Sequence, residues 1–194
     1  MTRAPRRAPS RMRRRWPWLA VAGVATAALL VVAVARIGQG GQASPGGQAI
    51  SVQRAGGAQV GQQAAAFTAT TSAGGRVTLP AGKPAVLLFM AAWCEPLLEA
   101  SALDRIERQA GSRVVVLAVD VDPSEPAEDL RRFAGKVGAR YGFVQDRQGA
   151  LAAAFGVRAL DSTVVLDAAG RIVYRDAAPT GEAMLRSALA KAGL

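Results

Sequence analysis

The sequence predicts an α/β sandwich with a mixed central sheet, preceded by one N-terminal transmembrane helix. Three observations lead to this prediction. An uncharged apolar stretch follows an arginine-rich leader, continuous apolar runs of strand length recur in the second half of the chain, and segments of helical length separate those runs. A chain of 194 residues has room for one ordinary domain and a leader.

The positive charge of the chain is confined to its N-terminal segment. The formal net charge is +10, but eight of the 24 basic residues and none of the acids lie in residues 1–36, so the remainder carries only +2. A basic leader beside an apolar segment is typical of a membrane-topology signal. We therefore expect no nucleic-acid partner.

Residues 19–35 (LAVAGVATAALLVVAVA) form the predicted transmembrane helix, after a basic cytoplasmic leader at residues 1–18. With the preceding Trp-Pro-Trp the stretch approaches the roughly 20 residues that cross a bilayer. The arginines predict that the N-terminus is cytoplasmic and the C-terminal domain extracytoplasmic in a single-pass cell-membrane protein. A cleaved signal peptide is the alternative, because Ala33-Val34-Ala35 resembles a cleavage site, but the apolar stretch exceeds the usual core of about 7–15 residues.

A flexible linker is predicted for residues 36–63, which are rich in Gly, Gln, Ala and Ser. Such a segment buries too little apolar surface to offset the entropy lost on ordering. A short strand near residues 49–52 has only weak support. The predicted globular domain spans residues 64–194.

Within that domain, hydrophobic patterning and turn residues predict the elements in order. A hairpin at residues 67–83 turns at Gly74-Gly75, and the apolar run AVLLFM predicts a doubly buried strand at Ala85–Met90. A helix is expected from near Cys94 to about Ala110, with Leu98, Ala102 and Ile106 on one face. The expected strands and helices that follow are strand 113–119, helix 128–137, strand 142–144, helix 148–155, the hairpin of strands 163–166 and 171–174, and helix 181–192.

The composition excludes several kinds of chemistry. The chain has no histidine and one cysteine, Cys94. It therefore has no His-ligated metal, no Ser–His–Asp triad, no intramolecular disulfide and no multi-cysteine zinc site. The acidic residues between positions 120 and 129 fit no EF-hand spacing. We expect neither a metal nor a cofactor, and any redox chemistry needs one thiol and an outside partner.

The segment FMAAWCEP, directly after the apolar strand, resembles the active site of the thioredoxin superfamily. It is most similar to the membrane-anchored TlpA/ResA-like branch, which typically shows FWATWC-x-P-C, with a Glu-Pro pair between the two cysteines in ResA-type members. Trp93, Cys94, Glu95 and Pro96 match that motif residue by residue. The segments VVVLAVDVD and GFVQDRQGALAAAFGVRALDSTVVLDAAGRIV resemble later parts of the same family, so the resemblance covers about 130 residues.

The resemblance implies a thioredoxin-like fold and a redoxin activity in cell redox homeostasis. Cys94 is the implied nucleophile, with Trp93, Glu95 and Pro96 beside it. A thiol in the first turn of a helix experiences exposed N–H groups and the positive end of the helix dipole, which favour the thiolate. We therefore expect the pKa of Cys94 to fall below its ordinary value. Pro96 is compatible with a first turn, because the N–H that it lacks has no intrahelical partner there.

Four positions depart from the family pattern. Leu97 replaces the second cysteine, which resolves the mixed disulfide in relatives. Asp161 replaces the cis-proline, and a non-proline residue prefers the trans peptide by about 2.5–4 kcal/mol. Leu88 replaces a polar residue and removes a buried proton acceptor. Ala100 stands where relatives carry glutamate, with Glu99 one position away.

The substrate-docking loop implied by the resemblance is Leu160, Asp161 and Ser162, and the loss of proline predicts that this loop is reshaped. Two other families fail on their residues. A copper-delivery protein of the SCO type needs a second cysteine and a histidine. A peroxiredoxin needs proline and threonine where the chain has Leu87 and Ala91.

Two functions remain open. The first is a monothiol thiol–disulfide oxidoreductase, in which Cys94 attacks extracytoplasmic protein thiols or disulfides and an external thiol resolves the product. The second is a redox-inactive thioredoxin-fold module that binds an extracytoplasmic partner. In that case Cys94 is a tolerated residue, and Trp93 and Pro96 remain for packing.

Overall fold

The structure is a computed structural model that describes residues 49–194 except Glu95. The predicted leader, the predicted transmembrane helix and residues 36–48 of the predicted linker lie outside the described residues, and so does Glu95. In the part that is described, no helix combines the length and the apolar character needed to cross a membrane.

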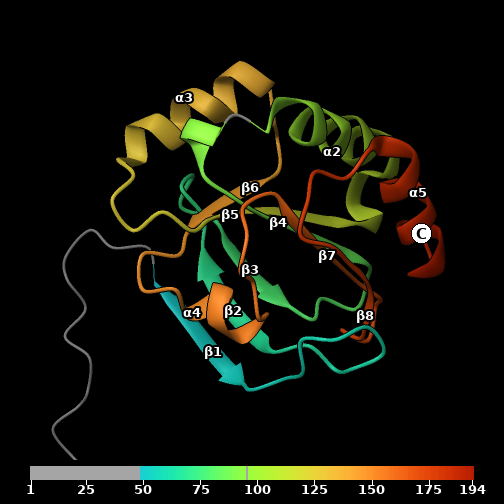
Figure 1. The fold of residues 1–194 in the computed structure, drawn as a ribbon. Coiled ribbons are helices and arrows are strands. Elements are labelled where there is room, and N and C mark those ends of the chain that lie inside the picture. Colours follow the sequence, from blue (N-terminus) through green and yellow to red (C-terminus); the bar gives the residue numbers. More distant parts are fainter. Residues whose placement is uncertain (1–48, 95) are drawn as a thin grey trace, which may run out of the picture. The chain divides into compact units, whose positions relative to one another are not determined.

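A mixed five-stranded sheet forms the centre of the fold, with the strand order β6-β5-β4-β7-β8 (Figure 1). Strand β4 is parallel to β5 and antiparallel to β7, and β6 is parallel to β5. The strands are β4 Ala85–Met90, β5 Val115–Asp120, β6 Gly142–Gln145, β7 Ser162–Leu166 and β8 Ile172–Arg175. The predicted mixed α/β sandwich is confirmed.

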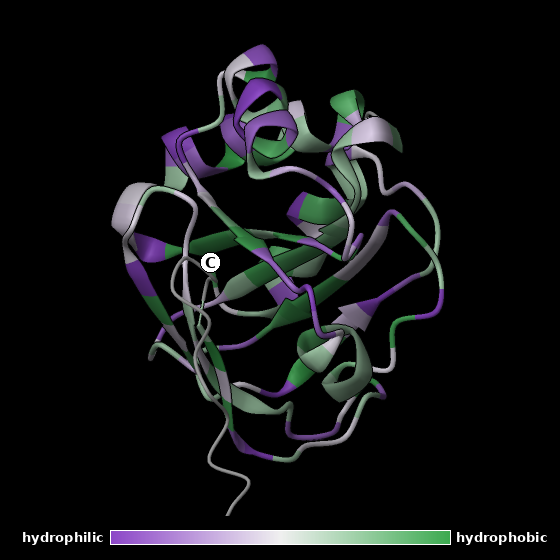
Figure 2. Ribbon diagram, turned by 90° about the vertical axis from the view of Figure 1, so that its left-hand side faces the viewer, coloured by the Kyte–Doolittle hydropathy of each residue, from purple (hydrophilic) through white to green (hydrophobic). Residues whose placement is uncertain are grey.

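Every residue of β4 is buried, because both faces of the sheet are covered. Successive strand residues point to opposite faces. Val86, Leu88 and Met90 pack in the core that α2, α3 and α5 cover, whereas Leu87 and Phe89 pack in the core on the other face. Figure 1 shows those three helices on one side of the sheet and α4 on the other, and Figure 2 shows hydrophobic residues along the central strands. The run AVLLFM is apolar at every position because β4 is buried on both faces of the sheet.

The helices agree with the predicted segments within a few residues, with one difference at the start of the first. The described helices are α2 Leu97–Ala110, α3 Ala127–Val137, α4 Ala150–Ala154 and α5 Glu182–Lys191. The segment before α2, Ala92–Cys94, is a 3-10 turn named η1, and a second 3-10 turn, η2, spans Gly111–Arg113. Cys94 therefore precedes the helix rather than starting it.

The predicted apolar face of α2 needs a correction. Ala102 and Ile106 are buried as predicted, but Leu98 is 89% exposed. Glu99 and Leu103 lie on the buried face instead. The i,i+4 pair Asp104–Arg108 is confirmed at 2.6 Å.

A second, three-stranded antiparallel sheet precedes the central one in the sequence. It consists of β1 Ile50–Arg54, β2 Ala66–Thr70 and β3 Arg76–Leu79. The predicted turn between β2 and β3 is confirmed, and Gly74 adopts a positive φ of 83° there, which glycine tolerates without a Cβ clash.

The folded part of the chain begins before residue 64, in contrast to the predicted domain boundary. Strand β1 lies inside the predicted linker and pairs with β2. The Gly61 N–H donates to the Ile172 carbonyl at 2.8 Å, and Gln63 forms a bridge with Arg171. Tertiary pairing, and not the composition of this polar segment, orders residues 50–63.

One edge of the five-stranded sheet collects the polar residues of interest. The parallel strands β4, β5 and β6 all end at this edge, and the antiparallel β7 begins there. In the register, Met90 is opposite Asp120, and Phe89 is opposite Ser162. The loop after β4, which carries Cys94, therefore lies between the end of β5 and the start of β7.

Candidate functional site

The Cys94 turn, residues Ala92–Cys94, leaves β4 as a single 3-10 turn. The Cys94 N–H donates to the Ala91 carbonyl at 3.1 Å, and Pro96 occupies the cap position before α2 with φ −70°. Cys94 is exposed and is a free thiol. Because α2 begins at Leu97, the thiol lies outside the helix, where the dipole favours a thiolate less strongly.

On the β5 side, the loop between β5 and α3 binds the Cys94 turn at two points. The backbone N–H of Ala92 donates to Glu125 Oε2 at 2.8 Å, and the indole Nε1–H of Trp93 donates to Asp122 Oδ2 at 2.8 Å. Hydrogen bonds from the hydroxyl and N–H of Ser124, and then from Trp93, lower the pKa of Asp122. Asp122 is therefore ionised when it accepts the indole bond.

On the β7 side, the thiol faces Asp161. The S–H of Cys94 donates to Asp161 Oδ2 at 3.7 Å, a distance typical of a sulfur hydrogen bond. Asp161 has a φ of 56°, in the left-handed region that aspartate enters more readily than most residues. The neighbouring Leu160 is half-buried, and Ser162 is buried with its hydroxyl bonded to the Ala159 carbonyl at 2.8 Å.

The surroundings of Cys94 raise the pKa of its thiol, so the predicted lowering is wrong. Partial desolvation contributes most, followed by the negative charge of Asp161 and its hydrogen bond to the thiol. A nearby carboxylate stabilises S–H relative to S⁻. The prediction counted the helix N-terminus, but the thiol lies before α2 and beside a carboxylate.

Glu99 places a second carboxyl group behind the Asp161 loop. It lies in the first turn of α2 and is only 3% exposed. Its Oε1 accepts a hydrogen bond from the Thr163 hydroxyl, and its Oε2 accepts the Thr180 N–H at 3.0 Å. Burial raises the pKa of Glu99 to about 7, although these two bonds act in the opposite direction. The site therefore contains a buried titratable group, although Leu88 is apolar as predicted.

The contacts of Glu99 continue into a network at the edge of β7 and β8. The Thr163 N–H donates to Asp176 Oδ1 at 2.8 Å, and the Tyr174 hydroxyl donates to Asp176 Oδ2 at 2.7 Å. The Thr180 hydroxyl also donates to Asp176. Glu99 therefore links α2, β7 and the segment before α5 through buried polar contacts.

A buried pair of carboxyl groups lies on the opposite side of the Cys94 turn. Asp120 ends β5 and is fully buried, and it shares a hydrogen bond with the buried Glu125. Asp120 also accepts the Asp122 N–H at 3.0 Å and the Gln145 side-chain amide at 3.4 Å. Burial, together with the bond and the charge of Glu125, raises the pKa of Asp120 to about 7. The Asp120 carboxyl group therefore holds its proton more tightly than an exposed aspartate does.

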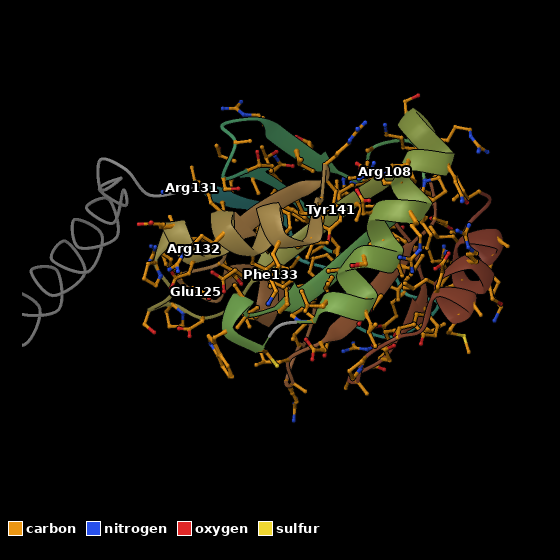
Figure 3. The ribbon with its side chains drawn as sticks, turned by 90° about the horizontal axis from the view of Figure 1, so that it is seen from above. Arg108, Glu125, Arg131, Arg132, Phe133 and Tyr141 are labelled. Carbon is orange, nitrogen blue, oxygen red and sulfur yellow. The ribbon has the colours of Figure 1, made fainter. Side chains whose placement is uncertain are left out.

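A surface hollow of about 320 Å³ opens beside this pair. Figure 3 shows Glu125, Arg132 and Phe133 at α3 and the loop before it. The hollow is lined by Ala92, Trp93, Glu125, Asp129, Arg132, Phe133 and Lys136.

Two large apolar side chains are exposed around the thiol. Trp93 is 64% exposed and Leu98 is 89% exposed, whereas Leu97 is half-buried against the core. Scattered apolar residues are ordinary on protein surfaces, but these two flank the single cysteine in sequence. Both side chains are available for contact with a protein partner.

The structure brings together most of the residues that the sequence selected. Trp93, Cys94 and Pro96 form one turn, and the Leu160–Ser162 loop faces it; Glu95 lies outside the described residues. Sequence reasoning missed the roles of Glu99, Asp120 and Glu125. Glu99 carried a detectable signal, since it is spaced four and seven residues from the buried Leu103 and Ile106 and therefore falls on the apolar face.

The described residues contain no group of three or more potential ligands that could hold a metal ion. The site brings together one thiol, the neighbouring carboxylate of Asp161 and three buried carboxyl groups, those of Glu99, Asp120 and Glu125.

The fold and the exposed cysteine at the end of β4 define a thioredoxin-fold protein of the redoxin class. A family model for AhpC/TSA proteins matches residues 60–175, and the chain belongs to the AhpC/TSA family. It is also 32% identical over 122 residues to a Streptomyces lividans protein described as mercury resistance operon ORF3. That match covers 60% of this chain and 64% of the relative, so the chain spans less than two thirds of the relative's length.

Solved structures of similar proteins agree with the fold. A thioredoxin-like protein from Aeropyrum pernix is 27% identical with a TM-score of 0.55, over 65% of this chain and 89% of that one. A secreted Mycobacterium tuberculosis disulfide oxidoreductase homologous to Escherichia coli DsbE is 24% identical with a TM-score of 0.56, over 64% and 95%. Peroxidoxin BcpB from M. tuberculosis is 24% identical with a TM-score of 0.58, over 71% and 97%. The two matches below 25% identity establish the fold alone.

Proposed function

We propose that the protein is a monothiol thiol–disulfide oxidoreductase in which Cys94 is the nucleophile. One observation carries the proposal: the only cysteine of the chain is an exposed thiol in the turn that follows the central strand, opposite the loop that precedes β7. Membership of the AhpC/TSA family supports thiol chemistry at this position. Leu97 supplies no second thiol, so the cycle requires an external one.

The reaction has two exchange steps. In the first, the Cys94 sulfur attacks a disulfide R–S–S–R′, forms the mixed disulfide Cys94–S–S–R and releases R′ as a thiolate, which takes up a proton. Cys94 loses its own proton to solvent, because its side chain is exposed. In the second step, an external thiol attacks the mixed disulfide, regenerates Cys94 and leaves with R in a new disulfide.

Asp161 acts against the first step at neutral pH. Its carboxylate accepts the S–H hydrogen bond and raises the pKa of Cys94, so most molecules hold a thiol and not a thiolate. We therefore expect slow exchange at pH 7 that accelerates toward alkaline pH. Thiolate that does form is a strong nucleophile, because nucleophilicity rises with thiol pKa.

Incubation with oxidised glutathione, followed by intact-mass measurement, tests the proposal. We expect one glutathione adduct per chain, released by dithiothreitol, at a rate that rises with pH. Cys94→Ser is the matched control and should form none. An unmodified wild-type chain after long incubation at pH 9 would contradict the enzyme proposal.

The proposed location is the outer surface of the cell membrane. The arginine-rich leader and the uncharged residues 19–35 support a single-pass anchor with the folded domain outside the cytoplasm. Extracytoplasmic protein thiols or disulfides are then the substrates. Protease added to intact spheroplasts should digest the domain; digestion only in inside-out vesicles would reverse the orientation, and a released form that starts near Arg36 would indicate a cleaved signal peptide.

A redox-inactive binding module is the second candidate, and a specific observation favours it. The raised pKa of Cys94 and the missing second cysteine weaken redox chemistry, while the exposed Trp93 and Leu98 remain available for contact. Cys94→Ala separates the two candidates. Partner capture that depends on Cys94 supports the enzyme, and equal capture by Cys94→Ala supports the module.

A further inference from the structure

The backbone of the Cys94 turn contacts a buried acid that the resemblance does not account for. The Ala92 N–H, two residues before the thiol, donates to Glu125 Oε2 at 2.8 Å. Glu125 is 4% exposed and lies 33 positions away in the chain, just before α3. A hydrogen bond from a buried N–H to a carboxyl group is costly to break, because no water molecule can then accept from the N–H in place of the carboxyl group.

Glu125 is itself constrained from several directions. Its carboxyl group bonds to Asp120, and its backbone carbonyl accepts the Gln145 side-chain amide at 3.0 Å and Arg147 Nη2 at 3.1 Å. The side chain therefore has little freedom to leave Ala92 while these contacts exist. The strand ends of β5 and β6 thus define where the Cys94 turn can lie.

We propose that Glu125 is a positioning residue that sets the backbone of the Cys94 turn, and that its hydrogen bond with Asp120 keeps it in place. This proposal rests on the proposed function for its catalytic consequence, but its structural part does not. When Asp120 loses its proton, two buried negative charges lie at hydrogen-bond distance. Their repulsion exceeds the gain from a stronger bond to one N–H, so the carboxyl groups separate and the turn loosens.

Other charged groups face the pair from the elements around it. Asp122 lies on the same loop, Asp146 and Arg147 follow β6, and Asp129, Arg132 and Lys136 come from α3. Arg147 contacts backbone and amide oxygens here, while the α3 residues line the adjoining hollow. Because burial and the Asp120–Glu125 contact dominate, the release occurs near pH 7, where the pKa of Asp120 lies.

Amide hydrogen exchange at Ala92 in the full chain tests the structural part without any thiol chemistry. We expect Glu125→Ala to lower the protection factor of this amide roughly tenfold at pH 6. Glu125→Gln should retain protection, because its amide oxygen still accepts the N–H. In the wild type we expect protection to fall as pH rises through about 7, and Glu125→Gln should lack this fall. Asp146→Asn is the matched control, since this buried carboxyl group at the neighbouring strand end binds the Ala152 N–H instead.

The rate constant for exchange with oxidised glutathione, corrected for thiolate fraction, tests the catalytic part. We expect Glu125→Ala to lower it several-fold, with recovery in Glu125→Gln. Unchanged Ala92 protection in Glu125→Ala, or an equal loss in Asp146→Asn, overturns the positioning role. If the wild type forms no glutathione adduct at all, the proposed function fails while the protection factors still decide whether Glu125 positions the turn.

Discussion

The Cys94 turn is bound differently on its two sides. Toward β5, two hydrogen bonds of 2.8 Å join the turn to Glu125 and Asp122. Toward β7, the polar contact between the described residues of the turn and the facing loop is the 3.7 Å bond from the thiol to Asp161. The β5 side therefore supports the backbone, whereas the β7 side determines the chemistry of the sulfur. Position and reactivity of one residue are set by separate parts of the sheet edge.

The buried Glu99 on the β7 side should produce the largest effect. Its pKa is raised to about 7, so the folded state binds its proton more tightly than the unfolded state does. The associated stability is present below about pH 4.3 and is lost as pH rises through about 7. As the pH rises from about 4 to 8, the wild type should therefore lose roughly 2–3 kcal/mol of unfolding free energy that Glu99→Gln retains.

Urea denaturation across this pH range measures the difference. Asp120 titrates in the same window, so part of the pH dependence should remain in Glu99→Gln. Glu128→Gln, at an exposed glutamate in the first turn of α3, is the control and should stay within about 0.5 kcal/mol at every pH. A Glu99→Gln curve parallel to the wild type would show that this carboxyl group is not perturbed by folding.

Asp161→Asn should accelerate exchange at Cys94. Removing the carboxylate charge lowers the pKa of the thiol and increases the thiolate fraction at pH 7. Reduced nucleophilicity offsets part of this gain, which leaves an increase of roughly three- to tenfold. Stopped-flow measurement with a chromogenic disulfide gives the rate and the pKa together.

Asp167→Asn is the control for that variant. The carboxylate of Asp167 accepts N–H groups in the hairpin turn between β7 and β8 and makes no bond to the thiol. Its exchange rate should equal that of the wild type. If Asp161→Asn were slower than the wild type, Asp161 would be assisting deprotonation and would not be opposing it.

Leu97→Cys should restore an internal disulfide. Leu97 is the first residue of α2 and lies three positions after Cys94, a spacing at which Cα atoms are about 5–6 Å apart and within disulfide reach. Mild oxidation should remove two free thiols without dimerisation, and disulfide reductase activity should be weak. The double variant with Asp161→Asn should be more active. Proline is unsuitable at position 161, because the φ of 56° is incompatible with its ring.

The readout is a thiol count before and after oxidation, with dimers excluded on a non-reducing gel. Ser101→Cys in the body of α2 is the control and should not pair with Cys94, because it lies seven residues away. If Leu97→Cys stays reduced, the Cys94 turn and the start of α2 are arranged differently from this structure.

Leu98→Asp should have the smallest effect on the protein alone. The side chain is 89% exposed, so its replacement should change the unfolding free energy by less than about 0.5 kcal/mol. Partner capture should fall, because a charge replaces an exposed apolar side chain close to Cys94 in the sequence. Met184→Asp, at an exposed methionine of α5, should leave capture unchanged; equal losses in both variants would exclude a specific role for Leu98.

Much of the fold could be predicted because burial leaves a clear trace in the sequence. The run at Ala85–Met90 became a strand with every residue buried, and the turn at Gly74 was recognisable from its glycines. Strand β1 left little trace, because four of its five residues are exposed and its order depends on pairing with β2. Local composition cannot reveal a strand that is stabilised by pairing with a later segment of the chain.

The candidate site was predictable in its identity and not in its electrostatics. The motif identified Cys94, Trp93 and Pro96, and the resemblance indicated Asp161 as part of the facing loop. A carboxylate near the sulfur was a weaker alternative for Asp161, and its 3.7 Å contact with the thiol and the contact of Glu125 with Ala92 came from the structure alone. These contacts join residues 67 and 33 positions apart, so the sheet order had to be known first.

By itself, the sequence determined that this chain has one thiol, no resolving cysteine and an α/β domain with a central strand ending at that thiol. These properties follow from residue identity and from hydrophobic periodicity, both of which are local. Only the tertiary structure decided the direction in which the pKa of Cys94 moves. That direction depends on the distance to charges from other strands and on how much water remains around the sulfur, and the packing of the sheet edge fixes both.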